Sequence, residues 1–197
     1  MPFDPDLTPL EPIKIKCTDT DCENDLHCFR ATNELRDLNR QGECRDCGAN
    51  LVDWNRIENK DLSDVEFTFN SLTYELIRHH FFHVEIDQRS INYALRKGKV
   101  GMLQAVENRL RKSIGEATPY RDGQQTPFEG NPIYYAQHAT ATCCRTCIEE
   151  WYGIPKGVPI QDEDISYFTE LIMEYIQKRI PTLSEEGIHV PPIRKKT

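Results

Sequence analysis

Two pairs of closely spaced cysteines in the first quarter of the chain constrain its fold more than any other feature. Cys17 and Cys22 have four residues between them, and Cys44 and Cys47 have two. Each spacing is typical of a tight turn that presents two thiolates to one metal ion, and Gly48 permits the close backbone approach of such a turn. Four thiolates complete a tetrahedral Zn²⁺ shell that excludes water. We therefore predict a structural zinc site.

The segment around these cysteines, residues 14–56, is too short to bury a large core. Metal binding would therefore supply much of its folding free energy. Short strands are predicted at 14–17 and 26–30, with turns between them, as in a zinc ribbon. Cys28 lies within the second strand. We interpret it as a small buried residue, and its replacement of Cys17 or Cys22 as a ligand remains an alternative.

The cellular compartment follows from the N-terminus and from the hydropathy of the chain. The first residues carry acids and prolines instead of a signal-peptide pattern, and no run approaches the roughly 20 apolar residues that cross a bilayer. We expect a cytoplasmic protein without a membrane partner, in which the eight cysteines are thiols or metal ligands. The net charge of −8 argues against non-specific DNA binding.

Residues 57–197 are predicted to form a second, mainly helical domain. Apolar periodicity indicates helices over 62–83, 90–96 and 102–114 and from Asp162 onward, with a break at Gly98 and Gly101. The segment IYYAQHAT (133–140) reads as a short strand. The predicted class is thus α+β: a small N-terminal zinc ribbon (14–56), then a mainly α-helical domain (57–197) with a short strand and a Cys/His turn.

A second group of metal-binding residue types lies at the end of that strand. His138, Cys144 and Cys147 occur within ten residues of one another. His79 and His83 continue the apolar stripe of the 62–83 helix by one turn, so they are predicted to face inward as further ligands. We therefore expect one zinc ion in the first site and a second ion in this one.

Two other chemistries remain open at the second group. Cys144-x2-Cys147 beside Arg145 is typical of a reactive dithiol, although a thioredoxin-like setting is missing. An open zinc site with a nearby carboxylate would activate water, as in a nuclease of the His–metal finger type. Arg121 on the preceding loop would then contact a phosphate or substrate.

Basic residues are concentrated between positions 96 and 121. The seven are Arg96, Lys97, Lys99, Arg109, Arg111, Lys112 and Arg121. They form either a solvated helix face or a nucleic-acid-binding surface. We favour a cytoplasmic zinc-binding accessory protein that recognises nucleic acid or a protein partner; no nucleotide cofactor is evident. The alternative is a metal-dependent hydrolase centred on His138, Cys144 and Cys147.

The segment DGQQTPFEGNPIYYAQHATATCCRTCIEEWYGIPKG (122–157) resembles the core of an uncharacterised bacterial domain-of-unknown-function family. Its longer members also carry an N-terminal ribbon, similar to residues 17–54 here, and RHHFFHVEIDQR (78–89) fits as well. The resemblance implies zinc binding without assigning an activity. It places the following residues in one site: Asp122, Gln125, His138, Cys144, Cys147 and Trp151. Tyr152 departs from the histidine of many members, which argues against a role there.

Overall fold

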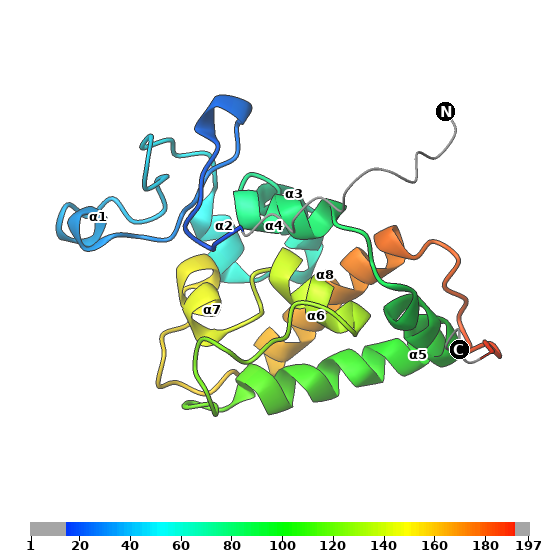
Figure 1. Ribbon diagram of the computed structural model, residues 1–197. Helices are drawn as coiled ribbons and strands as arrows, with labels where there is room; N and C mark the ends of the chain where they lie inside the picture. Colours follow the sequence, from blue (N-terminus) through cyan, green and yellow to red (C-terminus); the bar gives the residue numbers. More distant parts are fainter. Residues whose placement is uncertain (1–14, 192–197) are drawn as a thin grey trace, which may run out of the picture.

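Helices form the framework of residues 15–191, the part that the computed structural model describes (Figure 1). The N-terminal part contains the 3-10 turn η1 (Cys22–Asn24) and the short helices α1 (Asn33–Asp37) and α2 (Trp54–Asn59). The rest consists of η2 (Leu62–Asp64), α3 (Val65–Leu72), α4 (Leu76–His83), α5 (Gln88–Leu110), a π-helical turn η3 (Arg111–Gly115), α6 (Pro132–Ala139), α7 (Arg145–Tyr152) and α8 (Asp162–Arg179). None of these helices has the length and apolar composition of a membrane span.

The predicted α+β class is wrong, because residues 15–191 contain no β-strand. The two strand-like pairings in this range are isolated bridges, Asp21 with Leu26 and His27 with Glu75. The described part of 14–17 and residues 26–30 therefore do not build the strands of a ribbon. Turns and short helical segments form this region instead.

The segment predicted as a strand at 133–140 is helix α6. Asn131 caps this helix by accepting a hydrogen bond from the backbone N–H of Ile133, and Pro132 occupies the first turn. An Asn-Pro start is a strong helix signal because proline needs no N–H partner there. This start overrides the strand propensity of Ile133 and the tyrosines that follow it.

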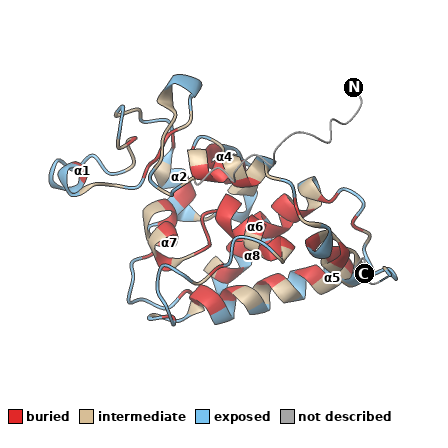
Figure 2. Cartoon of the chain, in the orientation of Figure 1, coloured by how far each residue is buried: buried red, intermediate tan, exposed pale blue. Residues whose placement is uncertain are grey.

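Helix α8 lies at the centre of the helical part and packs against α3, α5 and α6. Its apolar side is buried as the periodicity predicts: Ile165, Phe168, Leu171, Ile172, Tyr175 and Ile176. Figure 2 shows buried residues concentrated where α6, α7 and α8 meet, whereas the N-terminal loops are mostly exposed or half-buried.

The predicted helix over 62–83 is interrupted at residues 73–75. Asp61 caps its first turn by accepting from the Ser63 N–H, and α3 and α4 follow as separate helices. The interruption changes the rotational phase of α4 relative to α3. As a result, Ile77, Arg78 and Phe81 face the interior, and His83 is exposed.

The N-terminal part docks on the helical part through an aromatic cluster and backbone hydrogen bonds. The ring of Phe29 packs edge-on against Trp54 and Trp151, with centroids 5.6 and 5.9 Å away. The backbone of His27 accepts from the Leu76 N–H and donates to the carbonyl of Tyr74. The cysteine-rich loops are thereby anchored against α4 and α7 (Figure 1).

Gly98 breaks α5 in a conformation that only glycine adopts readily, with φ 66° and ψ 179°. The C-terminal segment crosses the break, and a Cβ at residue 98 would lie 2.3 Å from the carbonyl carbon of Glu186. We expect Gly98→Ala to lower the free energy of unfolding by at least about 1–3 kcal/mol in urea titrations. Gly101→Ala is the control and should cost less, because its backbone angles are helical and its Cβ would meet only the Lys97 side chain, at 3.1 Å. Equal stability of the two variants would contradict this account.

Candidate metal centres

Four side chains of the N-terminal part converge on one point: Cys22, His27, Cys44 and Cys47. One ligand atom from each lies within 4.8 Å of all the others, so this group can hold a metal ion. Cys22 begins the turn η1, and His27 follows it after the bridge between Asp21 and Leu26. Cys44 and Cys47 come from a turn that Gly48 closes at φ 76°, with its N–H bonded to the Cys44 carbonyl.

The spacing within this group fits a tetrahedral zinc shell. The sulfurs of Cys22 and Cys44 lie 3.7 Å apart, and His27 Nδ1 lies 3.4 Å from the sulfur of Cys47. Two thiolates bound at about 2.3 Å in a tetrahedral shell lie about 3.8 Å apart, and a thiolate and an imidazole nitrogen lie slightly closer. Three sulfurs and one nitrogen are a common donor set of structural zinc sites.

Neighbouring groups orient His27 and favour the thiolate of Cys44, whereas burial raises the pKa of Cys22 to about 12, so that a metal ion would have to displace its proton. Asp25 Oδ1 lies 3.0 Å from His27 Nε2, which orients the ring and leaves Nδ1 free to act as a ligand. Burial opposes ionisation of the Cys44 thiol, but backbone amides, those of Cys47 and Cys28 first, outweigh it and lower the pKa of Cys44 to about 6. Cys44 is therefore prepared to act as a thiolate ligand.

Two other N-terminal cysteines lie outside this group. Cys17, a predicted ligand, instead lines a small cavity together with Arg78 and Cys147. Cys28 is fully buried, and its thiol donates to the Cys17 carbonyl at 3.2 Å. The structure thus brings together three of the four predicted thiolates and adds a histidine.

The second cluster consists of Cys143, Cys144 and Cys147, at the start of α7. The sulfur of Cys147 lies 3.5 Å from that of Cys143 and 3.6 Å from that of Cys144. All three fall within 4.8 Å of one another, so this group too can hold a metal ion. The contact with Cys143, together with burial, raises the pKa of Cys144 to about 11. A metal ion would therefore have to displace a proton to bind this sulfur.

A buried arginine on α4 contacts this cluster. Arg78 is 2% exposed and donates to the sulfur of Cys147 at 3.1 Å and to the carbonyl of His138 at 2.6 Å. Its charge is balanced by Glu75, whose carboxylate accepts from Arg78 Nε at 2.8 Å and from the indole of Trp151 at 3.0 Å. This buried pair joins α4 to α7, and Arg78 supplies an N–H donor to a sulfur of the cluster.

The histidines predicted for the second site are not part of the cysteine cluster. The ring of His138 packs against both Phe81 and Phe128, with centroids 4.6 and 4.9 Å away, and burial and Arg78 lower its pKa to about 4. His79 and His83 pair with each other, their ring centroids 4.1 Å apart. The change of helical phase at residues 73–75 explains why these histidines lie apart from the cysteines. It turns Arg78 to the position that the apolar stripe predicts for His79.

The loop residues that the resemblance assigns to one site are divided between two places. Asp122 accepts from Gln125 Nε2 at 3.0 Å and pairs with Lys156, all on the surface. Trp151 lines the cavity beside Cys147. Tyr152 is buried, and its hydroxyl donates to the Thr140 carbonyl at 2.5 Å, which is a structural role.

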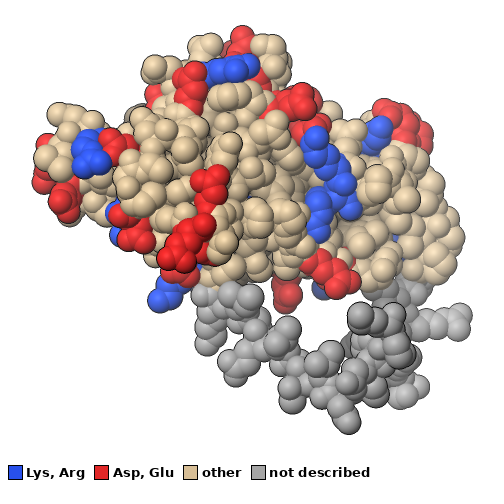
Figure 3. All heavy atoms as spheres, turned by 90° about the horizontal axis from the view of Figure 1, so that it is seen from above, with Lys and Arg blue, Asp and Glu red and all other residues tan. Residues whose placement is uncertain are grey.

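The seven basic residues between positions 96 and 121 do not form one surface. Arg111 pairs with Glu107 and Asp162, and Lys99 with Glu185. On the face drawn in Figure 3, basic and acidic side chains are interspersed. Arg96 bonds to the carbonyl of Val190, and Arg121 lies on the exposed loop. The remaining three line one pocket: Lys97, Arg109 and Lys112.

Sequence reasoning missed three residues that the structure brings to these centres: His27, Arg78 and Cys143. The signal for His27 was present, since it follows Cys22 after four residues and comes two residues after an acid that can orient its ring. Cys143 is adjacent to a predicted ligand. Arg78 had no local signal, because its position depends on the break between α3 and α4.

Comparison with known proteins finds a family match for most of the helical part. Residues 66–177 match a family described as a domain of unknown function (DUF4186), whereas no solved structure matches the chain. The match runs from α3 almost to the end of α8 and includes the second cysteine cluster; the first metal centre precedes it. Because the match covers more than half of its 197 residues, the chain belongs to the DUF4186 family.

Proposed function

We propose that this protein is a cytoplasmic zinc-binding accessory protein whose metal is structural and whose helical part carries the binding surface. The observation that carries the proposal is the convergence of Cys22, His27, Cys44 and Cys47 at tetrahedral spacing. When bound, the zinc ion would fix loops that have no strands of their own. Those loops support Phe29 and Trp54 against Trp151, so metal binding stabilises the docked arrangement.

The arrangement of the second cluster favours binding over hydrolysis. His138 is buried against two aromatic rings, and its Nε2 lies 3.2 Å from the carbonyl of Pro127. Nearby acids are engaged in structure: Asp87 caps α5 and accepts from the Tyr135 hydroxyl, and Glu150 accepts from the Ala31 N–H. A general base for an attacking water needs a carboxylate that other donors do not hold. Glu150 lines the cavity beside Cys147, but its second oxygen accepts from Arg36.

We also propose a second zinc ion, held by Cys143, Cys144 and Cys147. Their sulfur spacings of 3.5 and 3.6 Å support this assignment, as does Arg78, whose N–H group donates to the sulfur of Cys147. Donors of this kind compensate the charge of metal-bound thiolates. Elemental analysis of the purified protein should then give about two zinc ions per chain. One ion per chain would refute the second site, and none would refute both.

The orientation of His27 by Asp25 supplies a sharper test of the first centre. Asp25→Asn keeps the size of the side chain but weakens the hydrogen bond to His27 Nε2. We expect zinc affinity, measured by competition with a chromogenic chelator, to fall about 10–100-fold. Glu23→Gln, an exposed acid in the same turn, is the control and should bind as the wild type does. Unchanged affinity in Asp25→Asn would contradict the proposed role of His27.

A further inference from the structure

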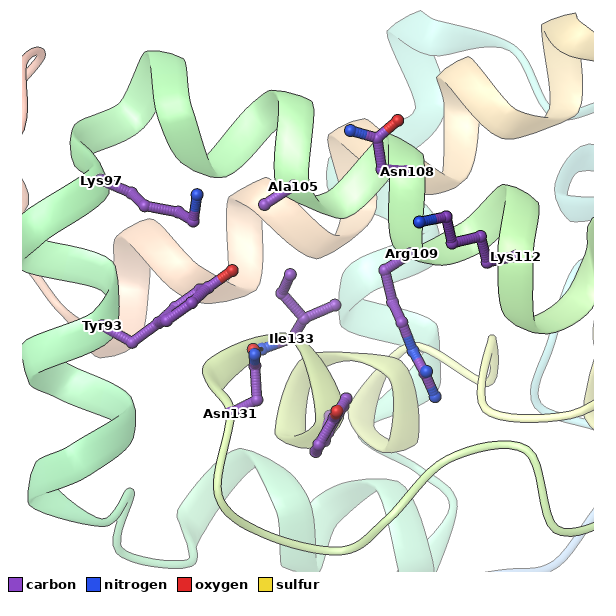
Figure 4. Close-up of a pocket in the computed structure, with 9 residues that line it drawn as sticks. Tyr93, Lys97, Ala105, Asn108, Arg109, Lys112, Asn131 and Ile133 are labelled. Atoms are coloured by element: carbon purple, nitrogen blue, oxygen red, sulfur yellow. Dashed lines mark hydrogen bonds between the residues drawn. The ribbon is translucent and has the colours of Figure 1, made fainter.

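Three basic residues that form no ion pair within residues 15–191 line a pocket between α5 and α6 (Figure 4). The cavity measures about 310 Å³, at the lower end of the range for small-ligand sites. Its lining residues are Tyr93, Lys97, Ala105, Asn108, Arg109, Lys112, Asn131, Ile133 and Tyr134. The break at Gly98 divides those on α5 into two sets, Tyr93 and Lys97 before it and the others after it.

The charge of this pocket is not balanced by the protein. Three cations line it and no carboxylate does. Within residues 15–191, neither Lys97 nor Lys112 forms an ion pair, whereas their neighbours Lys99 and Arg111 do. An uncompensated basic cavity attracts anions, because its walls concentrate the field.

Arg109 is held in place at the inner side of the pocket. It donates to the Gln125 carbonyl at 2.6 Å and lies 3.3 Å from Gln137 Oε1, which anchors the side chain against α6 and the loop before it. Burial lowers its pKa, which reflects the cost of keeping a cation there without a counterion. A bound anion would offset that cost.

Tyrosine rings lie beside two of the basic side chains in this pocket. The ammonium group of Lys97 lies 5.3 Å from the ring centroid of Tyr93, and the guanidinium of Arg109 lies 4.9 Å from that of Tyr134. Asn108 and Asn131 add amide groups to the lining. Cations beside accessible aromatic rings are a combination by which proteins bind a phosphate together with the base it carries, and both tyrosines are half-buried at the pocket.

We propose that this pocket binds one nucleotide unit, with its phosphate among Lys97, Arg109 and Lys112 and its base against a tyrosine ring. This inference deepens the proposed binding role by naming the ligand class, and it does not depend on zinc. The nucleotide comes either from a free nucleoside monophosphate or from a single-stranded nucleic acid.

The test is a titration of the full-length protein with three probes at low salt: inorganic phosphate, a nucleoside 5′-monophosphate and a fluorescent single-stranded 12-mer. We expect the nucleotide probes to bind more tightly than phosphate. Preference for the monophosphate assigns the pocket to a free nucleotide, and preference for the 12-mer assigns it to a strand. Absence of binding by all three probes, or phosphate binding as tight as either nucleotide probe, overturns the proposal.

Variants locate the binding in the pocket. Lys97→Gln with Lys112→Gln should weaken nucleotide binding at least about tenfold and reduce its salt dependence, because two phosphate contacts are lost. Tyr134→Leu should weaken it about fivefold or more by removing a stacking surface. Arg111→Gln is the matched control, a basic residue of the turn after α5 that is paired with acids, and should bind within about twofold of wild type.

Equal binding by wild type and the double lysine variant overturns the assignment to this pocket. Zinc content is measured on every variant and should be unchanged. A failed nucleotide titration with normal zinc content therefore refutes the pocket alone, and missing zinc with normal nucleotide binding refutes the metal proposal alone.

Discussion

Cys44→Ser is expected to remove one zinc ion per chain and to release the N-terminal loops from the helical part. Cys44 is 1% exposed and is the ligand whose thiolate is best stabilised by backbone amides. Loss of a residue that only orients a ligand costs about 10–100-fold in metal affinity, so loss of the ligand itself should exceed about 100-fold. Elemental analysis and limited proteolysis measure the two effects, and chelation of the wild-type protein should reproduce them.

Cys17→Ser is the matched control for this experiment. The spacing of the cysteines includes Cys17 among the ligands, whereas the structure places His27 there instead. We expect Cys17→Ser to retain the zinc of the first centre and His27→Ala to lose it. The reverse result, with zinc lost in Cys17→Ser and kept in His27→Ala, would show that four thiolates form the site.

Arg78→Met is expected to lower the free energy of unfolding by about 3–5 kcal/mol, since it leaves the carboxylate of Glu75 buried without its partner. Both side chains of this ion pair are at most 3% exposed, and among residues 15–191 Glu75 would keep the indole of Trp151 as its one side-chain donor. Urea unfolding at saturating zinc measures the loss, so that a change in metal occupancy does not contribute to it.

A double variant separates this charge effect from a loss of packing. Glu75→Gln combined with Arg78→Met removes both charges and should recover much of the stability. Lys99→Met breaks an exposed pair with Glu185 and should cost less than about 1 kcal/mol. An Arg78→Met protein as stable as the Lys99→Met protein would show that the buried pair contributes little.

Several local features of the fold could be predicted because a few neighbouring residues decide them. The apolar positions of α8 repeat at helical spacing, and all six predicted to be buried are buried. The break in α5 falls at Gly98, which has the backbone freedom that the crossing C-terminal segment requires. The predicted strand at 133–140 is wrong because the Asn131-Pro132 helix start outweighs the strand propensities of the residues after it.

The candidate metal centres show which ligands local sequence spacing can predict and which it cannot. Cys44 and Cys47 share one turn, so their spacing alone predicts that they act together. The choice of His27 over Cys17 depends on how the chain passes η1 and docks on α4. Likewise, the apolar stripe predicts the buried side of α3. Beyond residues 73–75 the helical phase changes, so Arg78 faces the cysteines in place of His79.

The sequence by itself therefore determined the pairs of cysteines that could bind a metal, most helices and the buried side of α8, because these depend on contacts within a few residues. Only the tertiary structure decided which side chains complete each centre and which cations share a pocket. Those choices depend on how segments far apart in the chain meet, and local spacing carries no information about the rotation of one helix relative to another.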